Sequence, residues 1–334
     1  MPPLLLLPAG HVMEAVQHDR SRRRAGALRQ RCSASGERSV AKPKVGVVGG
    51  GVVGGATVKL CGPDTIVYDP YKPELADNKD QINTCDVVFI CVPTPMADDG
   101  HCDTTIVEQA VAWVEAPLLI IRSTVAPGTT DRLREKYKKH VVFQPEYLGE
   151  TTAHVFGSMA EREFVVLGGT PEDVSKAADF YKHYYNAMVR MYFSDATTAE
   201  VCKYMENAFY AVKVTFVNEF YDIARVHGVD FNQLRELWLA DTRISRDHTF
   251  VYPDNRGFSG KCLPKDCNAI VHSCREKDYE PKLMAATLRI NEEFQARNAK
   301  PGKPAAGKRK LPRPAIGQRD CRPDAHETCP PRAS

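Results

Sequence analysis

The stretch "KVGVVGGGVVGGATVKLCGPDTIVYD", residues 44–69, decides the fold. It reads as a short apolar strand, a glycine-rich turn, the start of a helix and a second apolar strand. Three glycines have the spacing Gly49-x-Gly51-x-x-Gly54, and Asp69 ends the second strand. This order predicts a dinucleotide-binding unit. A carboxylate at that strand end accepts both ribose hydroxyls and repels a 2′-phosphate, so the predicted cofactor is NAD.

Each glycine has its own physical role in such a turn. Gly49 permits the tight turn, Gly51 lets a pyrophosphate approach the backbone, and Gly54 packs the helix on the strand. The N–H groups at the start of the helix then face the phosphates. We therefore expect the backbone at Val52 and Val53 to take part in cofactor binding.

Further apolar strands alternate with helical stretches after this unit. The predicted strands are "DVVFICV" (86–92), "PLLIIRS" (117–123), "HVVFQ" (140–144) and "EFVVLGG" (163–169). Strands alternating with helices predict an α/β fold with a doubly wound parallel sheet. We assign residues 44–195 to a Rossmann-type NAD-binding domain.

A helical region is predicted next. Residues 197–226 form one long helix with apolar side chains on nearly all its faces, which suits burial between domains or subunits. Residues 230–241 and 281–298 are also predicted to be helical, and a loop leads to "GFSGKCLPKD" at 257–266. We assign residues 196–297 to an all-helical central domain.

The two ends differ from the middle of the chain. Residues 1–44 carry nine Lys/Arg against three Asp/Glu, and 297–334 carry ten against three, so a net charge of +3 leaves the middle acidic. Residues 1–43 are expected to be a disordered or targeting leader. Their Arg/Ser-rich part is faintly like an organellar transit peptide. Residues 298–334, rich in Pro, Gly and Ala, are expected to be a disordered basic tail.

Composition also limits the compartment and the partners. No apolar run approaches the roughly 18 residues that span a bilayer, so no membrane partner is expected. The 11 cysteines are scattered without a paired CxxC framework, which favours a reducing compartment, the cytoplasm, with an organelle as the alternative. Basic ends without aromatic interleaving are a weak signal, and no nucleic-acid partner is predicted. No metal site is predicted.

Polar residues follow several predicted strands, where doubly wound folds bind their ligands. Thr94 ends one strand, Ser123 and Thr124 follow another, and Glu146 and Glu150 follow a third. Taken singly, each is an ordinary strand-end loop.

A lysine, an amide and a cysteine add to this set. Lys203 and Asn207 are four residues apart and so share one face of the long helix. Burying them without a ligand or partner is costly, and a solvated stripe is the alternative. Cys262 lies in a glycine-rich turn with Lys261 and Lys265 on either side, which favours the thiolate over the thiol, and Asp266 follows. Together these groups suit chemistry through a thiohemiacetal and a thioester.

Six motifs in this order resemble the UDP-glucose/GDP-mannose dehydrogenase family, from about Lys44 to Arg297. They are "VGVVGGGVVG", "ICVPTP", "STVAPGTT", "PEYLGE", "AEVCKYMENAFYAVKVTFVNE" and "GFSGKCLPKD". The resemblance implies oxidation of the C6 alcohol of UDP-glucose or another nucleotide sugar to a carboxylate, in two NAD-dependent hydride transfers. It also implies a homodimer through the 197–226 helix.

The resemblance further implies a role for each matching residue. Cys262 is the nucleophile, Lys203 and Asn207 stabilise the alkoxide and the later oxyanions, and Asp266 with Thr124 positions or activates water.

Other residues are implied to assist hydrolysis or to bind ligands. Glu146 assists hydrolysis of the thioester, and Thr94 and Thr124 lie near the nicotinamide. The implied substrate-binding residues are Glu146, Tyr147, Leu148, Glu150, Lys203, Asn207 and Gly257.

Two departures from the family pattern stand out. Ser259 replaces a second glycine of the cysteine motif. Family members also continue into a second Rossmann-like domain that helps to bind the nucleotide, whereas the chain from about Lys300 has neither strands nor helical periodicity. The chain is then truncated, or its last part diverges, or a partner supplies the missing half. Two other functions stay open: a non-catalytic NAD-binding dimerisation module and a simpler hydroxyacid dehydrogenase.

Overall fold

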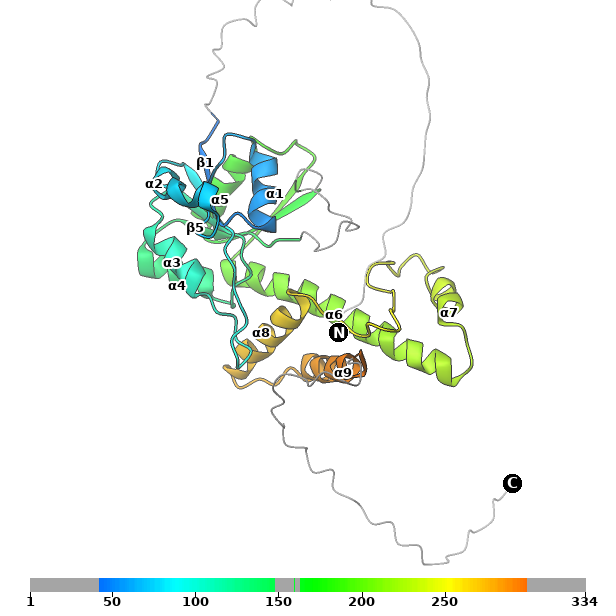
Figure 1. Cartoon of the computed structure of the whole chain (residues 1–334). Helices are drawn as coiled ribbons and strands as arrows, with labels where there is room; N and C mark the ends of the chain where they lie inside the picture. The colour runs from blue at the N-terminus through cyan, green and yellow to red at the C-terminus, as the bar shows by residue number, and fades with distance from the viewer. Residues whose placement is uncertain (1–41, 148–158, 160–162, 299–334) are drawn as a thin grey trace, which may run out of the picture. The chain divides into compact units, whose positions relative to one another are not determined.

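The computed structural model describes residues 42–147, 159 and 163–298 (Figure 1). The expected leader and tail, apart from Lys42, Pro43 and Asn298, lie outside the described residues. Leu148 and Glu150, which were predicted to bind substrate, also lie outside them. The chain divides into Met1–Lys42 and Pro43–Ser334, and every element described below belongs to the second unit.

Within the described residues, the sheet has seven strands in the order β2-β1-β3-β4-β5-β6-β7. These are β1 (Val45–Val48), β2 (Ile66–Tyr68), β3 (Val87–Ile90), β4 (Leu118–Ile121), β5 (Val141–Phe143), β6 (Phe164–Gly168) and β7 (Arg190–Ser194). Neighbouring strands are parallel except β5 and β6, which are antiparallel. The predicted doubly wound sheet is confirmed. Because β1 lies between β2 and β3, a ligand is expected beyond the carboxyl ends of β1 and β3.

Helices cover both faces of the sheet. They are α1 (Val52–Cys61), η1 (Pro73–Asn78), α2 (Lys79–Ile82), α3 (Thr105–Trp113), α4 (Thr129–Tyr137) and α5 (Pro171–Tyr181). Phe89 of β3 packs on one face against Phe180 of α5, with ring centroids 5.6 Å apart. Its neighbour Ile90 points to the other face and belongs to the same cluster as Leu133 of α4. Each fully buried side chain of this size contributes about 1.5–3 kcal/mol, so continuous apolar strands favour this two-faced burial.

The rest of the described chain is helical, as predicted. It contains α6 (Ala196–Val226), α7 (Phe231–Trp238), α8 (Leu263–Arg275) and α9 (Lys282–Asn298). The carboxylate of Asp195 accepts the N–H of Thr198 at 2.8 Å and caps the start of α6. Helices α8 and α9 pack against α6 (Figure 1). No helix among the described residues is both long and apolar enough to cross a membrane.

Two elements were not predicted. Helix α8 was not predicted, because the glycine-rich turn before it and Pro264 in its first turn are typical of a loop. Proline is nevertheless tolerated in the first turn of a helix, where its missing N–H has no intrahelical partner. Strand β7 was also missed, because its five residues are not buried and so lack the apolar signal of the inner strands.

Helix α6 joins the helical region to the sheet. A Cβ added to Gly168 of β6 would lie 2.5 Å from the Cβ of Ala199, so the strand and the helix are in close contact there. At the next residue of α6, the carboxylate of Glu200 accepts the N–H of Gly128 at 2.5 Å and that of Thr130 at 2.8 Å. Burial raises the pKa of Glu200 to about 7. This side chain satisfies backbone donors at the start of α4 and fixes the direction of α6 relative to the sheet.

The glycine turn after β1 is closely packed at two of its three glycines. Gly49 has φ +100°, and a Cβ there would lie 2.5 Å from the carbonyl oxygen of Cys91. A Cβ on Gly54 would lie 2.0 Å from the carbonyl oxygen of Gly49. Both close contacts are with backbone, which cannot move aside as a flexible side chain can.

We expect Gly54→Ala to lower the free energy of unfolding by about 1–3 kcal/mol, because the added methyl group overpacks α1 against the turn. Gly55→Ala, one residue along the same helix, is the matched control, since a Cβ there meets no atom within 4 Å. It should raise stability by about 0.5–1 kcal/mol through helix propensity. Urea unfolding measures both variants, and equal shifts in the same direction would contradict this account of the turn.

Candidate active site

The turn after β1 has the shape that a dinucleotide requires. A Cβ built on Gly51 meets nothing within 4 Å, in contrast to the crowded positions of the glycines on either side of it in the motif. Helix α1 begins at the next residue, Val52, whose side chain is exposed. Open space beside the N–H groups of a helix N-terminus accommodates a pyrophosphate. The backbone from Gly51 to Gly54 therefore fits the phosphates of NAD.

Asp69 lies beside this turn at the end of β2. Its Oδ2 accepts the N–H of Gly50 at 2.9 Å, and its Oδ1 accepts the N–H of Tyr71 at 3.0 Å. Lys72 donates from Nζ to the carbonyl of Gly50 at 2.6 Å. The carboxylate is thus held at the edge of the phosphate turn, in the place where a ribose is bound in this kind of fold.

The strand-end threonines lie close to a buried cysteine. Thr94 is buried after β3, and Thr124 is half-buried after β4. Cys102 donates its thiol hydrogen to the carbonyl of Thr124, with 3.4 Å between the heavy atoms. Burial raises the pKa of this thiol, and the side chains of Thr94 and Tyr204 bond to it with smaller and opposing effects. Thr94 and Thr124 therefore approach the same point beyond the sheet.

Lys203 and Asn207 lie on the buried face of α6. The Nζ of Lys203 is 3.4 Å from the Oδ1 of Asn207 and 3.4 Å from Glu206, and it lies over the ring of Tyr147. Asn207 donates from Nδ2 to the Oδ2 of Asp266 at 2.5 Å. Both α6 side chains are buried, 8% and 7% exposed, so the alternative of a solvated stripe is wrong. The sequence prediction that they share one face is confirmed.

Cys262 sits at the N-cap of α8, and its side chain is exposed. The N–H of Asp266 donates to the carbonyl of Cys262 at 2.9 Å, so the two residues lie one helical turn apart. Lys265 donates from Nζ to the Oδ1 of Asp266 at 2.5 Å. The start of a helix stabilises negative charge, which suits a reactive thiolate and the oxyanions that form next to it.

Gly257 shapes the loop that leads to this cysteine. Its φ is +79°, its N–H donates to the Oδ1 of Asn218 at 3.1 Å, and a Cβ there would lie 2.4 Å from the Oδ1 of Asn291. The neighbouring Arg256 donates from Nε to the same oxygen of Asn218 at 2.7 Å. Helices α6 and α9 thus hold the loop, and Gly257 is the residue type that this backbone requires. Its role in binding substrate stays a prediction.

Glu146 lies in a different environment from the cysteine. It forms a buried ion pair with Arg122 of the loop after β4, and its Oε1 accepts the N–H of Tyr147 at 2.7 Å. The structure therefore brings Asp266, Asn207 and Lys203 together, with Cys262 one helical turn from Asp266, and it connects Glu146 to Lys203 through its neighbour Tyr147. The role of Glu146 in hydrolysis stays a prediction.

Sequence reasoning missed two residues that support the site. Glu200 positions α6 on the sheet, and Arg256 anchors the loop before Cys262. Their only sequence signal is a charged residue within an otherwise apolar helix or beside a glycine. Solvated side chains give the same signal, so the pattern cannot identify them.

Fold and site together define a dinucleotide-binding protein with a cysteine-containing site at the end of its sheet. The NAD-binding domain of the UDP-glucose/GDP-mannose dehydrogenase family matches residues 74–188, and the central domain of the same family matches residues 197–293. The chain belongs to this family of NAD-dependent oxidoreductases. The glycine turn and Asp69 precede the matched range, so their assignment depends on the geometry described above.

Individual relatives agree with the family. A putative UDP-glucose 6-dehydrogenase of Bacillus subtilis is 28% identical over 75% of this chain and 67% of its own length. A UDP-N-acetyl-D-mannosamine dehydrogenase of Methanocaldococcus jannaschii is 32% identical over 66% of this chain and 49% of its own. A solved UDP-glucose dehydrogenase of Pyrobaculum islandicum is 26% identical, with a TM-score of 0.65 over 77% of this chain and 69% of that one. The chain spans about half to two thirds of the curated relatives it matches.

We expect Asp69→Ala to weaken NAD binding about tenfold, because two ribose hydroxyls lose their acceptor. The affinity for NADP should rise relative to that for NAD, because Lys72 would then face the 2′-phosphate of NADP with no carboxylate beside it. Asp64→Ala removes the same charge from an exposed position nearby and is the control. Calorimetric titration with NAD and with NADP measures the ratio of the two affinities. An unchanged ratio in Asp69→Ala would rule out this role for Asp69.

Proposed function

We propose that this chain carries out the NAD-dependent oxidation of the C6 alcohol of a nucleotide sugar, UDP-glucose, to the carboxylate, through a covalent bond to Cys262. The observation that carries the proposal is the hydrogen bond from Asn207 to Asp266. It joins α6 to the first turn of α8, and so places a buried lysine and amide beside a helix that begins at an exposed cysteine.

NAD would be held at the turn after β1, and two molecules of it in turn would accept the hydrides of the two oxidations. Removal of the first hydride and of the hydroxyl proton gives an aldehyde. The Sγ of Cys262 adds to its carbon, and the carbonyl oxygen becomes the oxyanion of a thiohemiacetal. Lys203 and the Nδ2 of Asn207 are the donors suited to that oxygen, because they are buried and positioned before the reaction.

A second hydride leaves the same carbon and a thioester forms. Water then attacks the thioester carbon, the C–S bond breaks, and the acid and the cysteine thiol are released. Asp266 is the nearest carboxylate to Cys262 along α8 and is suited to orient this water or accept its proton. Lys265 is paired with Asp266 and limits the build-up of negative charge there.

The identity of the sugar is a separate part of the proposal. Relatives include enzymes named for UDP-glucose and for UDP-N-acetyl-D-mannosamine. We propose UDP-glucose as the substrate because the six sequence motifs most resemble those of UDP-glucose dehydrogenases. Because the cysteines are scattered without a paired framework, which favours a reducing compartment, the proposed compartment is the cytoplasm.

The test is NADH release with UDP-glucose, GDP-mannose and UDP-N-acetylmannosamine. We expect two NADH per acid with UDP-glucose, and Cys262→Ser should lower acid formation at least about a thousandfold, because the covalent intermediate cannot form. Cys274→Ser, on the same helix, is the matched control and should keep the wild-type rate. Undiminished acid from Cys262→Ser would remove that residue from the mechanism. Turnover of only another sugar would correct the substrate, and NAD binding without any turnover would favour a non-catalytic module.

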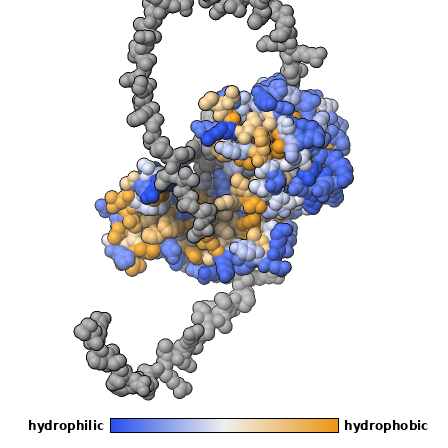
Figure 2. Space-filling view, turned by 180° about the vertical axis from the view of Figure 1, so that it is seen from behind, coloured by the Kyte–Doolittle hydropathy of each residue, from blue (hydrophilic) through white to orange (hydrophobic). Residues whose placement is uncertain are grey.

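We further propose a homodimer through α6. The side of this helix opposite Lys203 and Asn207 exposes a run of large apolar residues: Val201, Met205, Phe209, Phe216, Phe220 and Ile223. Met205 is 74% and Phe209 61% exposed. In Figure 2, apolar surface gathers over the helical part of the chain, whereas the sheet domain is largely hydrophilic. A contiguous apolar stripe of this kind is typical of a subunit interface.

Phe209→Asp is therefore expected to convert a dimer into a monomer, because a carboxylate would be buried in the interface without a partner. Met188→Asp, which replaces an exposed apolar residue just before β7, is the control and should leave the dimer intact. Light scattering after size exclusion gives the mass. A monomeric wild type, or a dimeric Phe209→Asp, would exclude this interface.

A further inference from the structure

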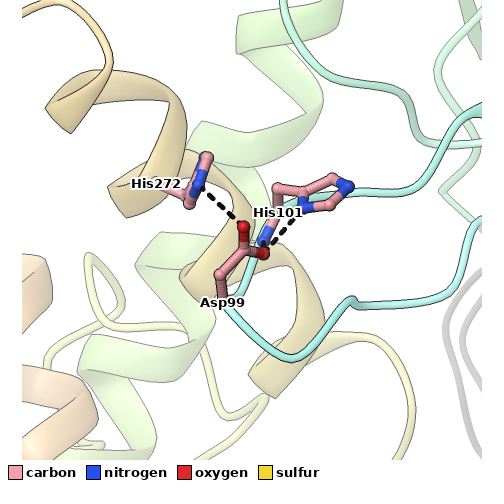
Figure 3. Close-up of side chains that lie close together, drawn as sticks. All are labelled: Asp99, His101 and His272. Atoms are coloured by element: carbon pink, nitrogen blue, oxygen red, sulfur yellow. Dashed lines mark hydrogen bonds and ion pairs between the residues drawn. The ribbon is translucent and has the colours of Figure 1, made fainter.

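Three potential metal ligands lie together where the loop after β3 meets helix α8 (Figure 3). Asp99 and His101 belong to the loop of residues 96–103, and His272 projects from α8. One ligand atom from each residue lies within 4.8 Å of the other two. We propose that this cluster binds a divalent transition-metal ion of the zinc type. The proposal does not rest on the proposed reaction.

The spacing of the donor atoms is close to that of a metal site. The Nδ1 of His101 is 2.6 Å from the Oδ1 of Asp99, and the Nε2 of His272 is 3.6 Å from the Oδ2 of Asp99. The two imidazole rings have centroids 5.6 Å apart. Tetrahedral zinc with bonds of about 2.0–2.1 Å needs about 3.3 Å between ligand atoms. Shifts of about an ångström in partly exposed side chains would meet that requirement.

Neighbouring groups orient the donors. Glu276, directly after α8, lies on the other side of the His272 ring, with its Oε1 3.8 Å from Nδ1, whereas Nε2 faces Asp99. A carboxylate behind a histidine is the usual partner of a metal-binding imidazole. The N–H of His101 donates to the Oδ1 of Asp99 at 3.1 Å and holds that carboxylate in the loop.

The donor set indicates the class of ion. Two imidazoles and one carboxylate suit zinc and its first-row neighbours, whereas calcium and magnesium prefer oxygen ligands alone. Three protein ligands leave a coordination position for water. Asp99 and His101 are exposed and His272 is partly exposed, so an ion can reach the site from solvent. A simple ion pair between Asp99 and the histidines is the alternative that the test must separate from metal binding.

The site would connect the cofactor domain to the catalytic helix. The same loop carries Cys102, which bonds to Thr124, and Gly100, which lies next to Asn268 of α8. Helix α8 begins at Cys262. A metal ion bridging His272 to the loop would therefore hold the end of β3 and the nucleophile helix in one arrangement.

Zinc and cobalt binding to the full chain tests the proposal. Equilibrium dialysis should find a zinc ion whose affinity falls at least about a hundredfold in His272→Ala and in His101→Ala, and about tenfold in Glu276→Gln. The cobalt spectrum of this site should lack the charge-transfer band of thiolate ligation, which separates it from the cysteines. Zinc at a hundredfold excess over its Kd should raise Tm by about 5 °C in the wild type and not in His272→Ala.

His183→Ala removes an exposed histidine of the sheet domain and is the matched control, which should bind zinc as the wild type does. Circular dichroism of each variant checks that it is folded. Equal zinc affinity in the wild type and His272→Ala would overturn the proposal and leave the cluster as an ion pair. If the tightest cobalt site of the wild type shows the charge-transfer band of thiolate ligation, the metal is bound by cysteines and the proposal is also overturned.

Discussion

The structure depends on one helix that is polar on its buried side. Along α6, Glu200 binds the start of α4, Asn207 binds Asp266 of α8, and Asn218 binds the loop at Arg256 and Gly257. These side chains recur at helical spacing, so one straight element contacts the sheet, the catalytic helix and the loop before the cysteine. Each contact satisfies buried polar groups, which makes the arrangement costly to change.

This arrangement fixes the chain on both sides of Cys262, the proposed nucleophile. Cys262 is exposed, yet the helix that begins there is held by Asp266, and the preceding loop is held by α6 and α9. The proposed catalytic groups thus come from α6 and α8, and the cofactor turn follows strand β1 of the sheet. The same helix exposes an apolar stripe on its other side, so the proposed site and the proposed subunit contact would lie on opposite sides of one element.

The proposed metal cluster also connects two separate parts of the chain. It joins the loop after β3, which follows a strand of the cofactor domain, to the end of the helix that carries Asp266. Two parts of the chain that form one reaction site are usually free to move relative to one another unless their interface is extensive. A bridging ion at His272 would restrict that motion near the C-terminal end of α8, the helix that follows Cys262.

Much of this could be predicted from the amino-acid order. Gly49, Gly51, Gly54 and Asp69 lie close together in the chain, and apolar runs identify buried strands locally, so the cofactor unit followed from residues 44–69 alone. Helix α8 could not be predicted from the sequence, because Pro264 in its first turn is typical of a loop. The pairing of Glu146 with Arg122 could not be predicted either, because an ion pair leaves no periodic pattern in the sequence. Only the tertiary structure decided which polar residues meet. Asn207 and Asp266 are 59 residues apart, and their contact exists because α6 and α8 pack against each other.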